Sequence, residues 1–76
     1  MTALEARNIL LTQMQAMTSA EYPVAWVGTL IEENEYTFCF EATVHATGED
    51  PREGFHYWFV NKDISGGCER CVPDLR

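Results

Sequence analysis

The residues best suited to chemistry in this sequence are three cysteines and two histidines. Cys68 and Cys71 form a C-x-x-C pair, a spacing typical of zinc sites and of thiol–disulfide oxidoreductases. A structural zinc ion needs four ligands, and Cys39, His45 and His56 are the other soft ligands, all expected on one sheet face. No helical pattern follows Cys71, which argues against a redox motif. A small zinc-binding protein using the C-x-x-C pair stays an alternative, but we expect no bound metal and no cofactor.

The sequence contains no recognisable catalytic constellation. His45 and His56 could transfer protons, but no motif pairs either of them with a nucleophile. Ser19 and Ser65 have no motif context, and the Gly66-Gly67 pair lacks the other residues of a phosphate-binding loop. We therefore expect no catalytic residue and predict that the protein is not an enzyme.

Carboxylates gather in two clusters, each at or beside a predicted turn. The clusters consist of Glu32, Glu33 and Glu35, and of Glu49, Asp50 and Glu53. Successive turns of a meander lie at opposite ends of the sheet, so we expect one cluster at each end, with Glu41 between them.

One helix and a sheet must position these residues. The apolar positions of residues 2–17 repeat at helical spacing. They are Ala3, Ala6, Leu10, Met14 and Met17, flanked by Leu4 and Leu11. Thr2 and Glu5 have the spacing of a capping box. Residues 22–31, 35–46 and 54–61 have strand character, and residues 68–72 add a short edge strand. The sequence predicts a single α+β domain over residues 1–76: one N-terminal amphipathic helix packed on a three- or four-stranded antiparallel β-meander.

The alternation in the strands suggests how the sheet is covered. We expect the helix to pack on a row of aromatic side chains. That row consists of Tyr36, Phe38, Phe40, Phe55, Tyr57 and Phe59. The opposite face would then carry Trp58 with Glu41 and have no cover, and an exposed aromatic surface often marks a contact site. The pattern leaves open which face the strand at residues 22–31 buries.

Composition narrows the class of partner. The 76 residues carry 5 Lys+Arg against 12 Asp+Glu, a formal net charge of −7, and 46% are hydrophobic. The hydrophobic share argues against disorder, and the acidity argues against direct binding to nucleic acid or an anionic membrane. A protein partner with a basic surface fits better. The odd cysteine count and the lack of a secretory signal pattern predict a cytoplasmic location.

Two stretches, residues 36–42 and 59–66, carry a family resemblance, together with Glu5-Ala6-Arg7 and Leu10-Leu11 in the helix. With these features the chain resembles the immunity protein 35 and YrhB-like group of small bacterial proteins. The resemblance implies a non-enzymatic protein that binds and neutralises a toxin, or a small chaperone-type binder. It also implies a structural role for a few positions: Phe38, Phe40 and Phe59 in the core, and Lys62-Asp63 and Gly66 in a turn.

These inferences combine into one functional prediction: a protein-binding module, most simply an immunity-type toxin inhibitor. The predicted contact residues are Trp58, Glu41, Glu32, Glu33, Glu35, Glu49 and Asp50. The alternative is an acidic inhibitor encoded by a phage or mobile element, of the anti-restriction or anti-CRISPR type. An uncovered face and an unpaired strand edge are also compatible with a homodimer.

Overall fold

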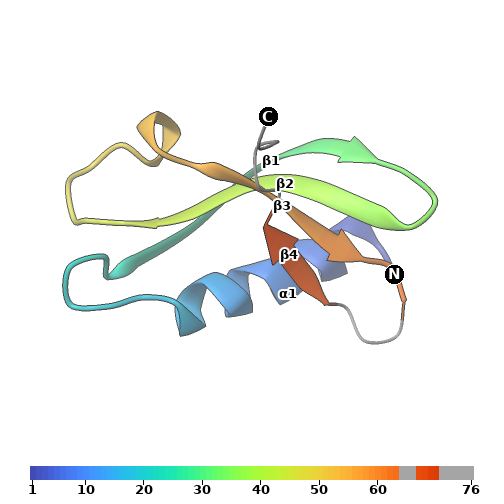
Figure 1. Ribbon diagram of the computed structural model, residues 1–76, viewed down its shortest axis with the longest axis horizontal. Coiled ribbons are helices and arrows are strands. Elements are labelled where there is room, and N and C mark those ends of the chain that lie inside the picture. The colour runs from blue at the N-terminus through green and yellow to red at the C-terminus, as the bar shows by residue number, and fades with distance from the viewer. Residues whose placement is uncertain (64–66, 71–76) are drawn as a thin grey trace, which may run out of the picture.

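The computed structural model describes residues 1–63 and 67–70, with Arg70 described by its backbone only, and places one helix against one antiparallel sheet (Figure 1). The elements in chain order are α1 (Ala3–Ala16), β1 (Val24–Glu33), β2 (Thr37–His45), the 3-10 turn η1 (Pro51–Glu53), β3 (His56–Asn61) and β4 (Cys68–Arg70). The four strands lie in the order β1-β2-β3-β4. The predicted α+β meander is therefore confirmed. Within the described ranges, no helix has the length and apolar character needed to cross a bilayer.

A capping box starts α1, as the sequence predicts. The Thr2 hydroxyl accepts a hydrogen bond from the Glu5 backbone N–H at 3.1 Å, and the Glu5 carboxylate accepts one from the Thr2 N–H at 2.7 Å. The backbone hydrogen bond from Thr2 lowers the pKa of Glu5. Because that pKa is lowered on folding, the carboxylate stabilises the helix at neutral pH, and this contribution is lost as the pH falls through the folded-state pKa.

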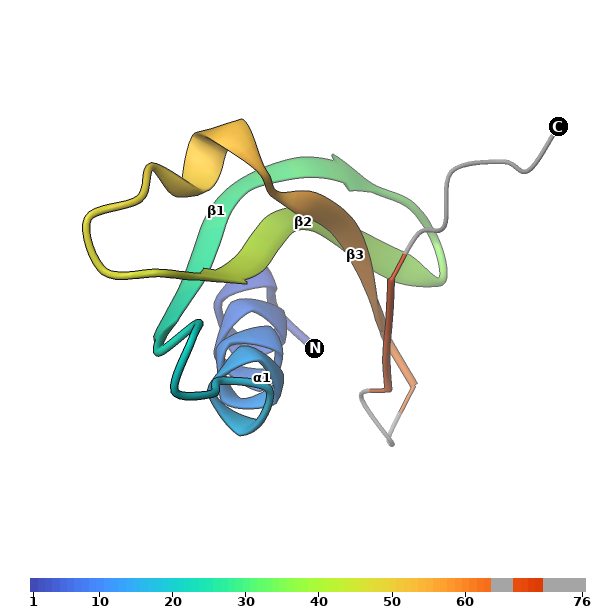
Figure 2. The ribbon, with the colours of Figure 1, turned by 60° about the vertical axis from the view of Figure 1, so that its left-hand side comes forward.

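The core lies between α1 and the concave side of the sheet, which curves over the helix (Figure 2). The helix contributes three fully buried residues at helical spacing, and the strands contribute six. These residues are Ala6, Leu10 and Met14 from α1, Val27 from β1, Phe38, Phe40 and Ala42 from β2, and Trp58 and Val60 from β3. The helix contacts all four strands, so the whole sheet depends on this single layer of packing.

Trp58 belongs to this core, and the expectation that it lies on the uncovered face is wrong. It pairs with Phe40 in the β2–β3 register and is 8% exposed beneath the helix. Residues 54–61 alternate between two apolar sets, so the pattern alone could not decide which set matches the aromatic face of β2. The structure selects the set with Trp58 and Val60. No described residue accepts a hydrogen bond from the buried Trp58 indole N–H.

Other expected core positions also lie outside the core. Tyr36 precedes β2 and is exposed, as are Leu4 and Met17 of the predicted helical stripe. Phe59 lies on the sheet face opposite the core, because it pairs with Cys39 rather than with Phe38 or Phe40. Trp58 and Val60 lie in the core instead, and Ile9 is partly buried against it.

The strand boundaries follow the predicted ones with small shifts. β1 extends to Glu33, and the turn to β2 is closed by the Asn34 side chain, which accepts hydrogen bonds from the N–H groups of Tyr36 and Thr37 at 2.7 and 2.9 Å. β4 covers residues 68–70 of the predicted edge strand, and residues 71–72 lie outside the described residues, as does Gly66.

Arg7 ties the helix to the edge strand β1. Its guanidinium donates hydrogen bonds to the carbonyl of Gly28 at 2.5 Å and to that of Val27 at 2.6 Å. The β1–β2 register shifts directly after Val27, so these contacts hold the strand where its pairing is irregular. The planar guanidinium reaches both carbonyls at once, which an ammonium group cannot do.

We expect the variant Arg7→Leu to lower the free energy of unfolding by about 1–3 kcal/mol, because two charged hydrogen bonds to carbonyl oxygens are lost. Arg7→Lys keeps the charge and one donor direction, so its free energy of unfolding should lie between those of the Leu variant and the parent chain. Urea unfolding of the three proteins measures both effects. Equal stability of the Leu variant and the parent chain would contradict the role given to Arg7.

Candidate functional site

The convex face of the sheet, turned away from α1, is covered by no described helix, and only the segment through η1 packs against its Thr43 end (Figure 2). Trp26 pairs with Thr43 and therefore points to this side, whereas Ala25 and Val27 point toward the helix. Tyr57 pairs with Glu41, and Phe59 with Cys39. We call this surface the open face and define it by Trp26, Cys39, Glu41, Thr43, Phe55, Tyr57 and Phe59.

Three aromatic rings form a continuous row across the open face. The Trp26 and Phe55 ring centroids are 6.3 Å apart at an interplanar angle of 47°, and those of Phe55 and Tyr57 are 5.5 Å apart, nearly perpendicular at 76°. Such tilted and edge-to-face contacts are the preferred geometries of aromatic pairs, so the rings support one another in fixed positions. Tyr57 nevertheless stays 45% exposed. The row is therefore an ordered aromatic surface.

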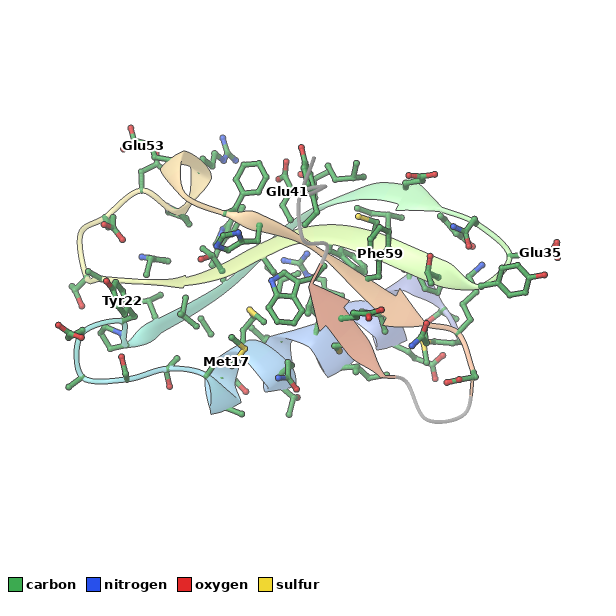
Figure 3. All side chains as sticks on the ribbon, in the orientation of Figure 1. Met17, Tyr22, Glu35, Glu41, Glu53 and Phe59 are labelled. Atoms are coloured by element: carbon green, nitrogen blue, oxygen red, sulfur yellow. The ribbon has the colours of Figure 1, made fainter. Side chains whose placement is uncertain are left out.

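Gly28 allows the Trp26 indole to lie flat along β1. A Cβ atom at Gly28 would overlap the six-membered ring of Trp26 and would lie 3.0 Å from a carboxylate oxygen of Glu41. The indole and the Glu41 carboxylate thus both approach the backbone of Gly28, and only glycine, which has no Cβ atom, leaves room for them. Glu41 is half-buried on the side of the sheet away from α1 (Figure 3).

A shallow hollow of about 200 Å³ lies at the hairpin end of the open face. Its walls come from Tyr57 and Phe59 on β3 and from Ile31 and Glu32 on β1, and Cys39 forms its floor. Cys39 is 5% exposed although it faces away from the helix. The hollow can receive a small apolar group with a donor directed at Glu32.

The acidic clusters occupy opposite ends of the sheet, as the sequence predicts. Glu35 projects from the β1–β2 hairpin and Glu53 from the η1 end (Figure 3). Glu33 is engaged with the chain itself: it forms an ion pair of 2.8 Å with Lys62, whose ammonium lies 4.6 Å from the Phe38 ring centroid. The contact role predicted for the carboxylates stays a prediction. Those with exposed side chains are Glu32, Glu33, Glu35, Glu49 and Asp50.

The aromatic residues of the open face are the part that sequence reasoning placed wrongly. Phe55, Tyr57 and Phe59 were expected beneath the helix, and Trp26 received no role. The alternation in β2 correctly placed Glu41 on the side away from the helix. Which side chains of β3 share that side follows only from the β2–β3 register. The indole that marks the open face is therefore Trp26, not Trp58.

The soft ligands do not converge in the structure. Cys39 and His45 share the parity of the open side, whereas His56 pairs with Ala42 and belongs to the helix side, so the expectation of one common face is wrong. Within residues 1–63 and 67–69, no group of three or more His, Cys, Asp or Glu side chains could hold a metal ion. Cys71 lies outside the described residues. Burial raises the pKa of the Cys68 thiol, the opposite of what a reactive thiolate requires.

Comparisons of this chain with protein-family models, with curated proteins and with solved structures found no match.

We predict that the two tryptophans contribute very differently to stability. Trp58→Ala should lower the free energy of unfolding by about 3–5 kcal/mol, or abolish cooperative unfolding, because it leaves a large cavity under α1. Trp26→Ala, the matched control, should cost clearly less because its side chain is only half-buried. Guanidinium unfolding followed by circular dichroism gives both values. A larger loss from Trp26→Ala than from Trp58→Ala would contradict the assignment of the two faces.

Proposed function

We propose that this chain is a non-enzymatic protein-binding module, and specifically an immunity-type inhibitor that neutralises a toxin protein in the cytoplasm. The observation that carries the proposal is the open face, where four aromatic residues lie on the side of the sheet away from α1. Its mechanism would be steric occlusion: the module covers the toxin surface that the toxin needs for its own activity. No catalytic group of the module takes part.

The aromatic row has the composition of a binding hot spot. Tryptophan and tyrosine dominate the energetics of protein interfaces because they bury a large area and lose little conformational entropy. Trp26, Phe55 and Tyr57 are already held by mutual contacts, so little ordering remains to oppose binding. A flat or gently concave apolar patch on the partner is the complementary shape for this convex sheet (Figure 2).

The charges of the described residues favour a basic partner. Arg7 is engaged with backbone carbonyls and Lys62 with Glu33, whereas the carboxylates of Glu32, Glu35 and Glu41 have no ion pair with a described residue. A surface with basic residues around an apolar centre would be steered toward this face and would meet Glu41 at its middle. The net charge of −7 also disfavours a second copy as the occupant, because acidic clusters would then face each other.

The resemblance to the immunity protein 35 and YrhB-like group supports the same proposal. Two of its structural positions, Phe38 and Phe40, lie in the core as the resemblance implies. Phe59 differs, because it lies on the open face and becomes available to a partner. The alternative of an inhibitor that mimics nucleic acid fits less well, since such mimicry needs carboxylates across the contact surface, and the middle of the open face is aromatic.

The proposal predicts that open-face aromatics determine capture of the partner. We expect Trp26→Ala and Tyr57→Ala each to weaken binding by about 2 kcal/mol or more, roughly thirtyfold, as is usual for hot-spot residues. Tyr36→Ala is the matched control, because Tyr36 is 74% exposed but lies outside the open face. Affinity capture with the parent chain identifies the partner, and calorimetric titration of the purified partner then compares the variants.

Folding of each variant is checked by circular dichroism before the titration. The proposal fails if the captured partner is bound equally well by the parent chain and by both open-face variants, or if Tyr36→Ala weakens binding as much as they do. A nucleic-acid-binding enzyme as the captured partner, displaced by its own nucleic acid, would favour the alternative of an acidic inhibitor from a mobile element.

A further inference from the structure

An aromatic ring and a carboxylate meet at one point on the open face. A Cβ atom on Gly28 would overlap the six-membered ring of Trp26 and would lie 3.0 Å from Oε1 of Glu41, so both groups flank the same glycine. Trp26 and Gly28 lie on β1, and Glu41 lies on the neighbouring strand β2. A group that lies over the indole beside Gly28 therefore contacts the ring and the carboxylate together.

The Trp26 indole at this point is ordered and reaches solvent. The Phe55 ring packs against it with 6.3 Å between the ring centroids. The Trp26 N–H bonds to no described residue, yet among the described residues the buried side-chain polar atom without a partner is Nε1 of Trp58. The Trp26 N–H is therefore accessible, and the indole is available to a ligand without any rearrangement of the sheet.

The Glu41 carboxylate has no cation of its own. Arg7 reaches the same glycine, but its guanidinium donates to the carbonyl oxygens of Val27 and Gly28 and forms no ion pair with a described residue. Glu41 is half-buried, and no described residue donates a hydrogen bond to its carboxylate. A carboxylate that has lost part of its water and has no partner is stabilised by a cation from outside.

The strand positions around Glu41 add acidic charge. Glu32 and Glu69 share the open side with Glu41, because they pair with residues of that side in β2 and β3. Within the described strands the one Lys or Arg is Arg70, which pairs with the core residue Trp58 and so takes a register position of the helix side. The open face is thus complementary to a cation and not to an anion.

We propose that the partner protein places an arginine at this point, with its guanidinium stacked on the Trp26 indole and paired with the Glu41 carboxylate. The proposal rests on the proposed function and deepens it by naming the central contact. A guanidinium is planar, so its face can lie on an indole while the N–H donors at its edge reach a carboxylate. An ammonium group has no flat face and makes only one of these contacts well, so arginine is preferred over lysine.

The test uses the full chain and small probes, so it does not depend on knowing the partner. Nα-acetyl-arginine methylamide, whose one charge is the guanidinium, is titrated at constant ionic strength into protein labelled with ¹⁵N-tryptophan. The indole N–H signals of Trp26 and Trp58 are followed by NMR. We expect the Trp26 signal to shift along a binding curve. Trp58 is the internal control, because it is buried beneath the helix.

Two further probes separate charge from shape. The citrulline analogue keeps the planar head without its charge, and the lysine analogue keeps the charge without the plane. We expect no measurable binding of the citrulline probe, and binding of the lysine probe about threefold weaker than that of the arginine probe, the size of an exposed cation–π contact. A lysine or citrulline probe that binds as tightly as arginine, or an unshifted Trp26 signal, would each overturn the proposal.

Glu41→Gln separates this site from general attraction to an acidic protein. We expect it to weaken the arginine probe by about threefold, as for the loss of one ion pair near the surface. The matched control is Glu21→Gln, which removes the same charge from an exposed residue in the connection between α1 and β1 and should leave the affinity unchanged. Equal weakening by the two variants would contradict the site.

The two proposals can fail separately. If the arginine probe binds beside Trp26 but Trp26→Ala and Tyr57→Ala leave partner capture intact, the proposed function fails and the guanidinium site remains. If the open-face variants lose capture but the arginine probe does not shift the Trp26 signal, the arginine contact fails and the proposed function remains.

Discussion

A single short helix can bury only one face of a four-stranded sheet, and this shortage of cover determines the rest of the molecule. The three fully buried residues of α1 pack against the concave side of the sheet, where they contact large apolar side chains of β2 and β3. The N-terminal half of the helix is fixed by the capping box at Thr2 and Glu5 and by the contact of Arg7 with β1. Everything apolar on the other side must be tolerated in water or covered by another molecule.

The open face shows how this tolerance is arranged. Its rings contact one another, which reduces the apolar area that each presents to water, and Gly28 lets the Trp26 indole lie against the strand beside Glu41. Carboxylates lie at both ends of the sheet and add charge beside the apolar rings. In the function that we propose, the same features would select a partner with an apolar patch and basic residues around it.

Local signals in the sequence predicted most of the fold, because each depends on neighbours along the chain. Helical spacing located α1, the Thr2–Glu5 spacing located its start, and alternation separated the two sides of β2. The face of β3 could not be predicted in this way, because Trp58 and Val60 compete with Tyr57 and Phe59 as equally apolar sets. The choice depends on the register that the β2–β3 loop imposes, and a shift of one residue exchanges the two faces. The open face was therefore predicted to exist, with the wrong indole on it.

The accessibility of the two indoles tests this account most directly. Trp58→Phe leaves Trp26 as the only tryptophan, and Trp26→Phe leaves Trp58, so acrylamide quenching of fluorescence reports on one face at a time. The account predicts a clearly higher quenching constant for the chain that retains Trp26, and a low constant, rising only on unfolding, for the chain that retains Trp58. A Trp58 that is quenched as readily as Trp26 in the folded protein would contradict it.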